Sequence, residues 1–426
     1  MTVHVKQDKP ATDNRLDTMR QGVIGKPVSR IEGLAKVTGT APYAAEYPVE
    51  GCAEAVLVTA TITRGSVVRI DAESALAMPG VIAVIDDERL TTRPAQGTAN
   101  EAPQQKPRTI CYWGQPLALV VAESFEQARD AARLLVVEYQ PGEAAPVEAD
   151  PSIAEEQEDE TVREGNLDKA MSDAAHAVDL TYTTKGHASA AMEPHAAIAQ
   201  WDGERLTVHA SLQMLNYNIT ELSDALDLPE DRIRLISRYV GGGFGSKLGI
   251  SEEVVAASIA AMQLERPVRV VMSRQQVFQS IIRRSETTQR LRLACDTDGR
   301  LTGFGHEALV SNLPGEEFAE PVLQSSHFLY PGENRELVLK LARIHRMTAG
   351  SVRAPGEAVG MPALEAAMDV LAERAEIDPV ELRLRNIPDK DPEQGLPFSS
   401  HKLAECLRQG AEAFGWDSGP RKPRLR

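Results

Sequence analysis

Short segments in which hydrophobic and polar residues alternate recur along the chain, and this period of two predicts β-strands. In the segment 232–239, Ile233 and Leu235 fall on one face. The segments 196–201 and 206–210 flank an Asp-Gly pair, which is typical of a tight turn, so they predict a hairpin. The other segments in which we expect strands are 56–62, 81–85, 117–121, 136–139, 177–184, 267–272, 287–294 and 301–310.

Four stretches carry helix signals. Ser124 and Gln127 form a capping pair for a helix that we expect to end near residue 134. The alanine-rich stretch 252–263 follows a serine that can cap it. Asp378 precedes a proline that favours the first turn of a helix, and 361–375 is amphipathic. Because strand and helix segments are mixed, we predict the α+β class.

The chain divides into five expected parts. Residues 1–21 are polar and predict a flexible arm, and 22–145 predict a small α+β domain. Residues 146–165 are rich in acidic side chains and predict a linker of solvated coil. Residues 166–417 predict a second domain, and 418–426 form a basic tail.

Composition narrows the function classes. The 426 residues suffice for two or three domains, and the net charge of −16 argues against nucleic acid or an anionic membrane as the main partner. No apolar run reaches transmembrane length and no secretory signal is visible, so we expect the cytoplasm, with export on a signal-bearing partner left open. The four cysteines are too far apart in sequence for ligand spacing, so we expect no iron–sulfur or zinc ligands in this chain.

A glycine loop, 241–247, has the sequence GGGFGSK and lies between a predicted strand and a predicted helix. It lacks the Gly-Lys-Ser/Thr of a P-loop, and neither register supplies the third glycine of the dinucleotide fingerprint. Four glycines let backbone amides approach anionic oxygen closely. A tight strand-to-helix turn without a ligand is the alternative.

Further segments accompany the loop: 25–27 (GKP), 36–43 (KVTGTAPY), 192–195 (MEPH), 353–357 (RAPGE) and 378–383 (DPVELR). In this order they resemble motifs of the molybdenum-binding large subunits of the xanthine dehydrogenase and aldehyde oxidase family. The resemblance is closest to the bacterial aldehyde oxidoreductase type and covers the amino-terminal half of such a subunit.

The resemblance implies a hammerhead-like α/β domain followed by the first part of a molybdopterin-binding α+β domain. It also implies a molybdenum–pterin cofactor, as molybdopterin or its cytosine dinucleotide, and partner subunits that carry iron–sulfur clusters and FAD. Such enzymes oxidise aldehydes to carboxylic acids with oxygen from water. The cofactor, and not side chains, holds the metal, so no metal-ligating residue is expected.

The resemblance also assigns site residues. Those expected to bind the cofactor are Gln213, Gly242, Gly243, Phe244, Gly245, Arg353 and Ala354. Taken singly, Gln213 could be a polar group at a strand end, and Arg353 could pair with Glu357.

Phe244 and Leu248 are expected to line the substrate pocket. Purine-hydroxylating members carry a glutamate where Leu248 stands and an arginine near Glu320-Pro321. An apolar pocket favours a small aldehyde over a purine.

The family's Gly-Val-Gly-Glu motif, which supplies the general base, is absent from this sequence. We therefore expect no catalytic residue in this chain and no activity from the chain alone. Three interpretations stay open: a split subunit completed by a separate chain, a truncated product, or a fragment of a longer protein. A truncated, non-catalytic remnant or assembly scaffold is the alternative function.

Overall fold

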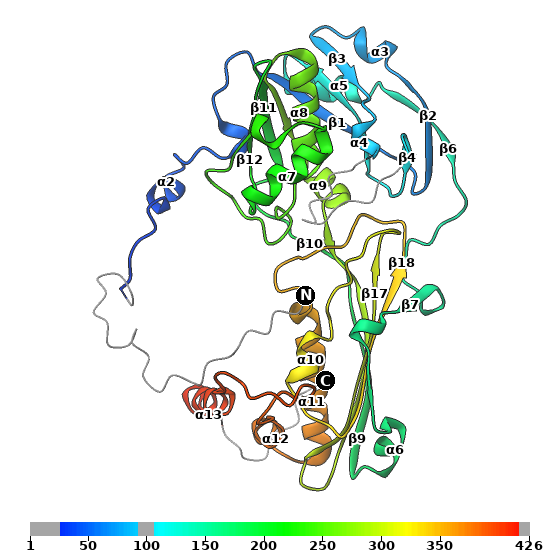
Figure 1. Ribbon diagram of the computed structural model, residues 1–426, viewed down its shortest axis with the longest axis vertical. Coiled ribbons are helices and arrows are strands. Elements are labelled where there is room, and N and C mark those ends of the chain that lie inside the picture. The colour runs from blue at the N-terminus through cyan, green and yellow to red at the C-terminus, as the bar shows by residue number, and fades with distance from the viewer. Residues whose placement is uncertain (1–25, 93–105, 417–426) are drawn as a thin grey trace.

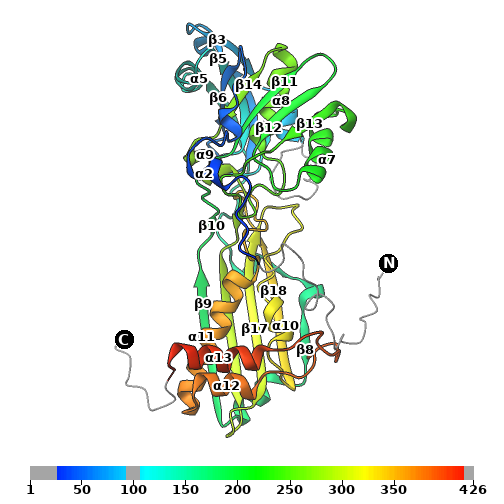
Figure 2. The same ribbon diagram turned by 90° about the vertical axis from the view of Figure 1, so that its left-hand side faces the viewer.

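The computed structural model describes residues 26–92 and 106–416. Two bodies lie one above the other, with the short strand β10 (His187–Ala188) between them in both views (Figures 1 and 2). The expected arm 1–21 and tail 418–426 lie outside the described residues.

The upper body contains a seven-stranded sheet with a helix on each face. In sheet order the strands are β13 (Ile233–Ile236), β12 (Leu206–Ala210), β11 (Ala196–Trp201), β14 (Val268–Val271), β1 (Ala53–Thr59), β5 (Pro116–Ala122) and β3 (Val81–Ile85). Helix α8 (Glu252–Leu264) is buried over most of its length and packs on one face, with the main core cluster between them. Helix α5 (Phe125–Ala132) packs on β1 and β5 through a smaller cluster.

The lower body contains a six-stranded sheet. Its strands are β7 (Ala154–Glu156), β8 (Val162–Glu164), β18 (Asn334–Arg343), β17 (Leu301–Asn312), β16 (Thr287–Cys295) and β9 (His176–Thr184). Helix α11 (Glu357–Ala375) covers one face (Figure 1), and its apolar side forms the second core cluster with the strands. Helix α6 (Leu167–Asp173) packs against β16, β17 and β18.

Smaller elements complete the described chain. A three-stranded sheet joins β4 (Thr109–Ile110), β2 (Gly65–Asp71) and β6 (Val136–Pro141), and β10 pairs with β15 (Arg283–Arg284). The remaining α-helices are α2 (Gly33–Val37), α3 (Glu73–Leu76), α4 (Arg89–Thr92), α7 (Leu215–Leu226), α9 (Arg274–Ser280), α10 (Gln324–Phe328), α12 (Pro379–Arg385) and α13 (Leu403–Phe414). Four short 3₁₀ helices lie at Ala44–Glu46, Pro151–Ile153, Glu158–Glu160 and Glu230–Arg232.

The expected α+β class is confirmed. The predicted hairpin forms, because β11 and β12 pair antiparallel. The Ser124 side chain accepts a hydrogen bond from the Gln127 N–H, and Asp378 caps α12 by accepting from two backbone amides. No helix in residues 26–92 and 106–416 is long and apolar enough to cross a bilayer.

The acidic segment 146–165 is not the solvated coil that we expected. Strands β7 and β8 both pair antiparallel with β18, at different places along it. The open edge of β18 supplies backbone partners that composition cannot reveal. Acidic side chains are compatible with an edge strand, and Arg163 pairs with Glu156 here.

The seven-stranded sheet crosses the predicted border at residue 145. Strand β1 lies before that border and pairs parallel with β14, which lies well after it, in the register Ala53 with Val268. The two segments share one hydrophobic core. The border at residue 145 therefore does not separate two independent hydrophobic cores. The domain boundaries themselves stay a prediction.

Candidate functional site

The glycine loop bends sharply between β13 and α8. Gly242, Phe244 and Gly245 have φ angles of +104°, +54° and +99°. A bulky residue in the left-handed region costs about 1–2 kcal/mol, and such strain gathers at functional sites. Phe244 is 44% exposed, so a large part of its ring faces outward from this chain.

Two glycines of the loop stand where no side chain fits: a Cβ on Gly245 would lie 1.8 Å from the carbonyl oxygen of Ser351, and one on Gly241 would lie 2.5 Å from Cβ of Glu193. A Cβ on Gly243 would lie 2.2 Å from Oε1 of Gln213, so that side chain would have to move. The Gly245 N–H donates to Gln213 Oε1 at 3.2 Å. The loop thus contacts the chain after β12 on one side and the chain before residue 352 on the other.

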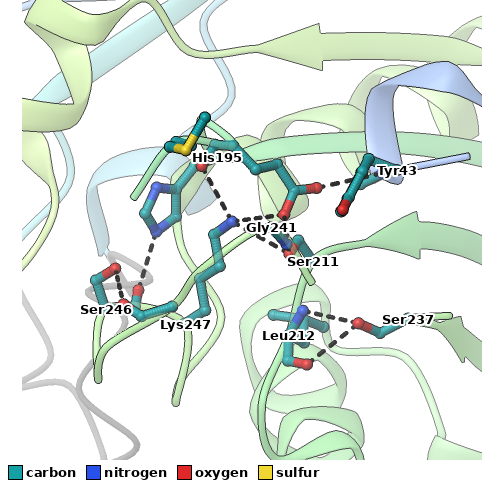
Figure 3. A network of polar contacts seen from close by, with 12 residues as sticks. Tyr43, His195, Ser211, Leu212, Ser237, Gly241, Ser246 and Lys247 are labelled. Carbon is teal, nitrogen blue, oxygen red and sulfur yellow. Dashed lines mark hydrogen bonds and ion pairs between the residues drawn. The ribbon is translucent and has the colours of Figure 1, made fainter. Parts of the chain in front are cut away.

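A buried ion pair holds the start of the loop (Figure 3). Lys247 is fully buried, and its ammonium lies 2.9 Å from Glu193 Oε2 and 3.1 Å from Ser211 Oγ. The same carboxylate accepts from the Gly241 N–H at 2.6 Å and from the Ser211 hydroxyl at 2.7 Å. Its other oxygen accepts from the Ala44 N–H at 3.4 Å. Burial lowers the pKa of Lys247, and Glu193 opposes this shift.

Ser246 and His195 fix the other side of the loop. The Ser246 hydroxyl donates to the Gly243 carbonyl at 2.8 Å, and Ser189 donates to Ser246 Oγ at 2.7 Å. Nε2 of the buried His195 lies 2.9 Å from the Ser246 carbonyl. Burial lowers the pKa of His195, so the neutral ring donates this hydrogen bond.

A second loop, 352–356, lies against the first. The Arg353 N–H donates to the Phe244 carbonyl at 2.8 Å. Ala354 and Gly356 have φ angles of +53° and +79°, so this loop also carries left-handed residues. The Arg353 side chain is exposed and, within the described residues, pairs with no carboxylate. The alternative pairing with Glu357 is therefore absent from the structure.

Unpaired backbone donors gather where the two loops meet. Within residues 26–92 and 106–416, no protein group accepts a hydrogen bond from the N–H groups of Gly242, Gly243, Phe244 and Ala354. Free N–H groups in left-handed turns bind anionic oxygen. This donor set and the side-chain-free surface of the glycines fit a cofactor that carries oxygen acceptors.

The predicted residues fall into two groups. Those that the described contacts bring together are Gln213, Gly243, Phe244, Gly245 and Arg353, with Gly242 and Ala354 beside them in the chain. Leu248 is half-buried and lies just beyond the loop, where its carbonyl accepts from Asn218 Nδ2 at 2.7 Å. The roles of all eight residues stay predictions.

Sequence reasoning missed the residues that hold the loops. Glu193 lies in a motif that we recognised, but nothing in the motif showed that it pairs with the loop. Arg284, which lies beneath the second loop, carried no signal, and its partner Glu320 was noted only for the substrate comparison and not as a support of the loop. Glu221 was also missed, and its carboxylate accepts from the Ile250 N–H at 3.0 Å.

Two family models match the chain. A molybdopterin cofactor-binding domain matches residues 148–387, and the a/b hammerhead domain of aldehyde oxidase and xanthine dehydrogenase matches residues 38–143. The chain belongs to the aldehyde oxidase and xanthine dehydrogenase family. The predicted resemblance is thereby confirmed, including a hammerhead domain followed by a molybdopterin-binding domain.

Curated members of this family differ in how much of their length the chain covers. The aldehyde oxidoreductase molybdenum-binding subunit PaoC of Escherichia coli (strain K12) is 41% identical over 418 residues, which are 97% of this chain and 57% of PaoC. The xanthine dehydrogenase molybdenum-binding subunit of Escherichia coli O157:H7 is 29% identical, over 91% of this chain and 55% of that subunit. The chain therefore spans little more than half the length of these relatives.

A third relative is similar in length to this chain. The nicotinate dehydrogenase large molybdopterin subunit of Eubacterium barkeri is 26% identical over 379 residues, which are 85% of this chain and 89% of that subunit. Among solved structures, the aldehyde oxidoreductase from Desulfovibrio gigas aligns with a TM-score of 0.79 at 25% identity, over 91% of this chain and 46% of that protein.

Proposed function

We propose that this chain is a component of a molybdenum hydroxylase, and that it contributes two of the loops that hold the molybdenum–pterin cofactor. The observation that carries the proposal is the group of N–H donors on the joined loops for which the described residues offer no acceptor, at positions that the family resemblance assigns to the cofactor. The match to a molybdopterin cofactor-binding domain supports the same cofactor class.

The chain's own residues would bind and orient this cofactor. The N–H groups of Gly242, Gly243 and Phe244 would donate to its oxygen acceptors from one side, and that of Ala354 from the other. Gln213 is exposed and uses Oε1 to hold the Gly245 N–H, so its amide NH₂ group can still donate. When bound, the cofactor supplies the two-electron oxidation, while the protein supplies position and electrostatics.

The reaction that we propose converts an aldehyde and water into a carboxylic acid, two electrons and two protons. The carbon–hydrogen bond of the aldehyde is replaced by a bond to oxygen derived from water. The electrons pass to subunits that carry iron–sulfur clusters and FAD. Sequence similarity to an aldehyde oxidoreductase molybdenum-binding subunit supports this substrate class.

We further propose that a separate chain completes the site. The motivation is that the Gly-Val-Gly-Glu motif, which the family resemblance assigns to the general base, does not occur in these 426 residues. The completing chain would supply the general base and the remaining cofactor contacts. The whole enzyme would then comprise this chain, its completing chain, and the iron–sulfur and flavin subunits.

The test compares the purified chain with the complex that it forms when co-produced with the proteins encoded beside it. We expect molybdenum, pterin and aldehyde-dependent dye reduction in the complex and no turnover by the chain alone. Turnover by the isolated chain with bound molybdenum would refute the split site. A stable complex without molybdenum or pterin would instead favour the non-catalytic scaffold.

Substrate preference is the second test. Leu248 stands beside the glycine loop and Pro321 beside the second loop, where purine-hydroxylating relatives are expected to carry charged anchors. A site built around a buried polar anchor rejects substrates that lack the matching group by about 10⁴–10⁵-fold, but an apolar wall rejects a polar competitor by only about 10²-fold. We therefore expect kcat/KM for benzaldehyde to exceed that for xanthine by about 10²-fold. Equal or better use of xanthine would show that purine contacts come from elsewhere.

A further inference from the structure

A buried arginine lies directly beneath the second loop. Arg284, in β15, is 4% exposed, and its guanidinium pairs with Glu320, which is fully buried. The same guanidinium donates to three consecutive carbonyls of the loop. These are the carbonyls of Val352 at 2.9 Å, Arg353, and Ala354 at 3.3 Å. One side chain therefore fixes three peptide planes.

Glu320 holds the far end of the same loop. Its Oε1, which pairs with Arg284, also accepts from the Gly356 N–H at 2.8 Å. A Cβ on Gly356 would lie 2.1 Å from the Pro321 carbonyl oxygen, so the loop is pressed closely against its support. Ala354 and Gly356 both have positive φ, and such conformations persist only where the surroundings impose them.

The direction of the loop's N–H groups follows from these contacts. In a trans peptide the carbonyl and the next N–H point in opposite directions. Because the Val352 carbonyl faces Arg284, the Arg353 N–H points away from it and reaches the Phe244 carbonyl at 2.8 Å. Because the Arg353 carbonyl also faces Arg284, the Ala354 N–H points away and is left free within the described residues.

We propose that Arg284, paired with Glu320, is a positioning residue of the cofactor site: it turns the Ala354 N–H toward the cofactor and presents Arg353 beside the glycine loop. This inference rests on the proposed function. It assigns a role to two charged residues that lie outside both loops. If these residues have this role, their loss should loosen the backbone of the segment 352–356, which can be measured without any turnover.

The test uses the co-purified complex and the double variant Arg284→Met/Glu320→Gln. A single Arg284→Met change would leave a buried carboxylate unpaired and could prevent folding, whereas the double variant removes both charges. The control is Arg290→Met/Asp179→Asn, which removes a half-exposed ion pair on the neighbouring strands. The readouts are hydrogen–deuterium exchange of peptides covering 350–358, bound pterin and molybdenum, and the melting temperature.

We expect the double variant to melt within a few degrees of the wild type, while exchange in 350–358 rises at least about ten-fold. Bound pterin should fall by at least about ten-fold, because residues that orient cofactor-binding groups usually contribute that much to affinity. The control variant should change neither the exchange rate nor the pterin content. Wild-type exchange and pterin content in the double variant would overturn the positioning role. A wild-type complex without pterin would instead overturn the proposed function, which separates the two failures.

Discussion

The glycine loop and the loop 352–356 are both held by a buried ion pair, but the charges come from different places. In the glycine loop the cation, Lys247, belongs to the loop itself. Beneath the second loop, Arg284 and Glu320 both lie elsewhere in the chain. In each case the carboxylate also accepts an N–H from a glycine of the loop. Lys247 and Glu193 therefore both lie in recognised motifs, whereas Arg284 lies in none, and in neither case does the sequence show the pairing.

The largest effect should come from breaking the pair that holds the glycine loop. Lys247→Met leaves the Glu193 carboxylate nearly buried without its cation, so we expect the free energy of unfolding to fall by about 3–5 kcal/mol. Lys169→Met, which removes an exposed pair, should cost less than about 1 kcal/mol. Urea denaturation of the three proteins gives both values. Equal losses in the two variants would contradict the role of the buried pair.

The next largest loss of stability should come from a substitution at Gly245, where the glycine loop packs against the backbone just before the second loop. Gly245→Ala would place a methyl group against the Ser351 carbonyl at a residue with φ of +99°. Overpacking and the left-handed conformation together should cost about 2–5 kcal/mol. Gly410→Ala, at a helical glycine with nothing within 4 Å of its Cβ position, is the control. Thermal unfolding compares them, and an unchanged Gly245→Ala protein would mean that the loops do not meet as described.

A smaller, pH-dependent effect on the free energy of unfolding should come from Glu221, whose carboxylate accepts from the Ile250 N–H just beyond the glycine loop. Burial raises the pKa of Glu221 from 4.5 to about 7, while Asn218 and the Ile250 N–H act in the opposite direction. The folded state therefore holds this proton more tightly than the unfolded state does. Its contribution is fully present below pH 4.5 and is lost as the pH rises through about 7.

The size of this contribution is at most about 3 kcal/mol between those pH values. Glu221→Gln removes the titrating group, so its free energy of unfolding should fall less than that of the wild type over the same range. Denaturation at closely spaced pH values measures the difference. Parallel pH profiles for the two proteins would show that Glu221 is not the titrating group.

Local patterns predicted the elements better than their partners. Alternation located β11, β12 and β13, and capping residues located α5 and α12, because these signals lie within a few adjacent residues. The pairing of Ala53 with Val268, and of the acidic segment with β18, depends on backbone contacts between distant parts of the chain. Nothing in either segment specifies the other.

For the candidate site, too, local sequence motifs were predictable, whereas contacts between distant residues were not. The resemblance located Gln213, the glycine loop and Arg353, and the structure brings their loops into contact. It could not reveal that Phe244 and Ala354 are left-handed, or that Arg284 fixes three carbonyls at once. These properties arise only from the folded chain, since neither an arginine nor a glutamate by itself indicates what it will face.

The measurement that tests the central claim most directly is the pterin and molybdenum content per chain of the purified complex, with and without Gly243→Val. The added side chain would occupy the position that Gln213 Oε1 now borders at 2.2 Å, and so displace both Gln213 and any ligand of the free N–H groups. If the loops hold the cofactor, the wild type and Gly410→Ala should contain it and Gly243→Val should lose it while remaining folded. Full pterin and molybdenum content in Gly243→Val would contradict the account and leave the glycine loop as a turn.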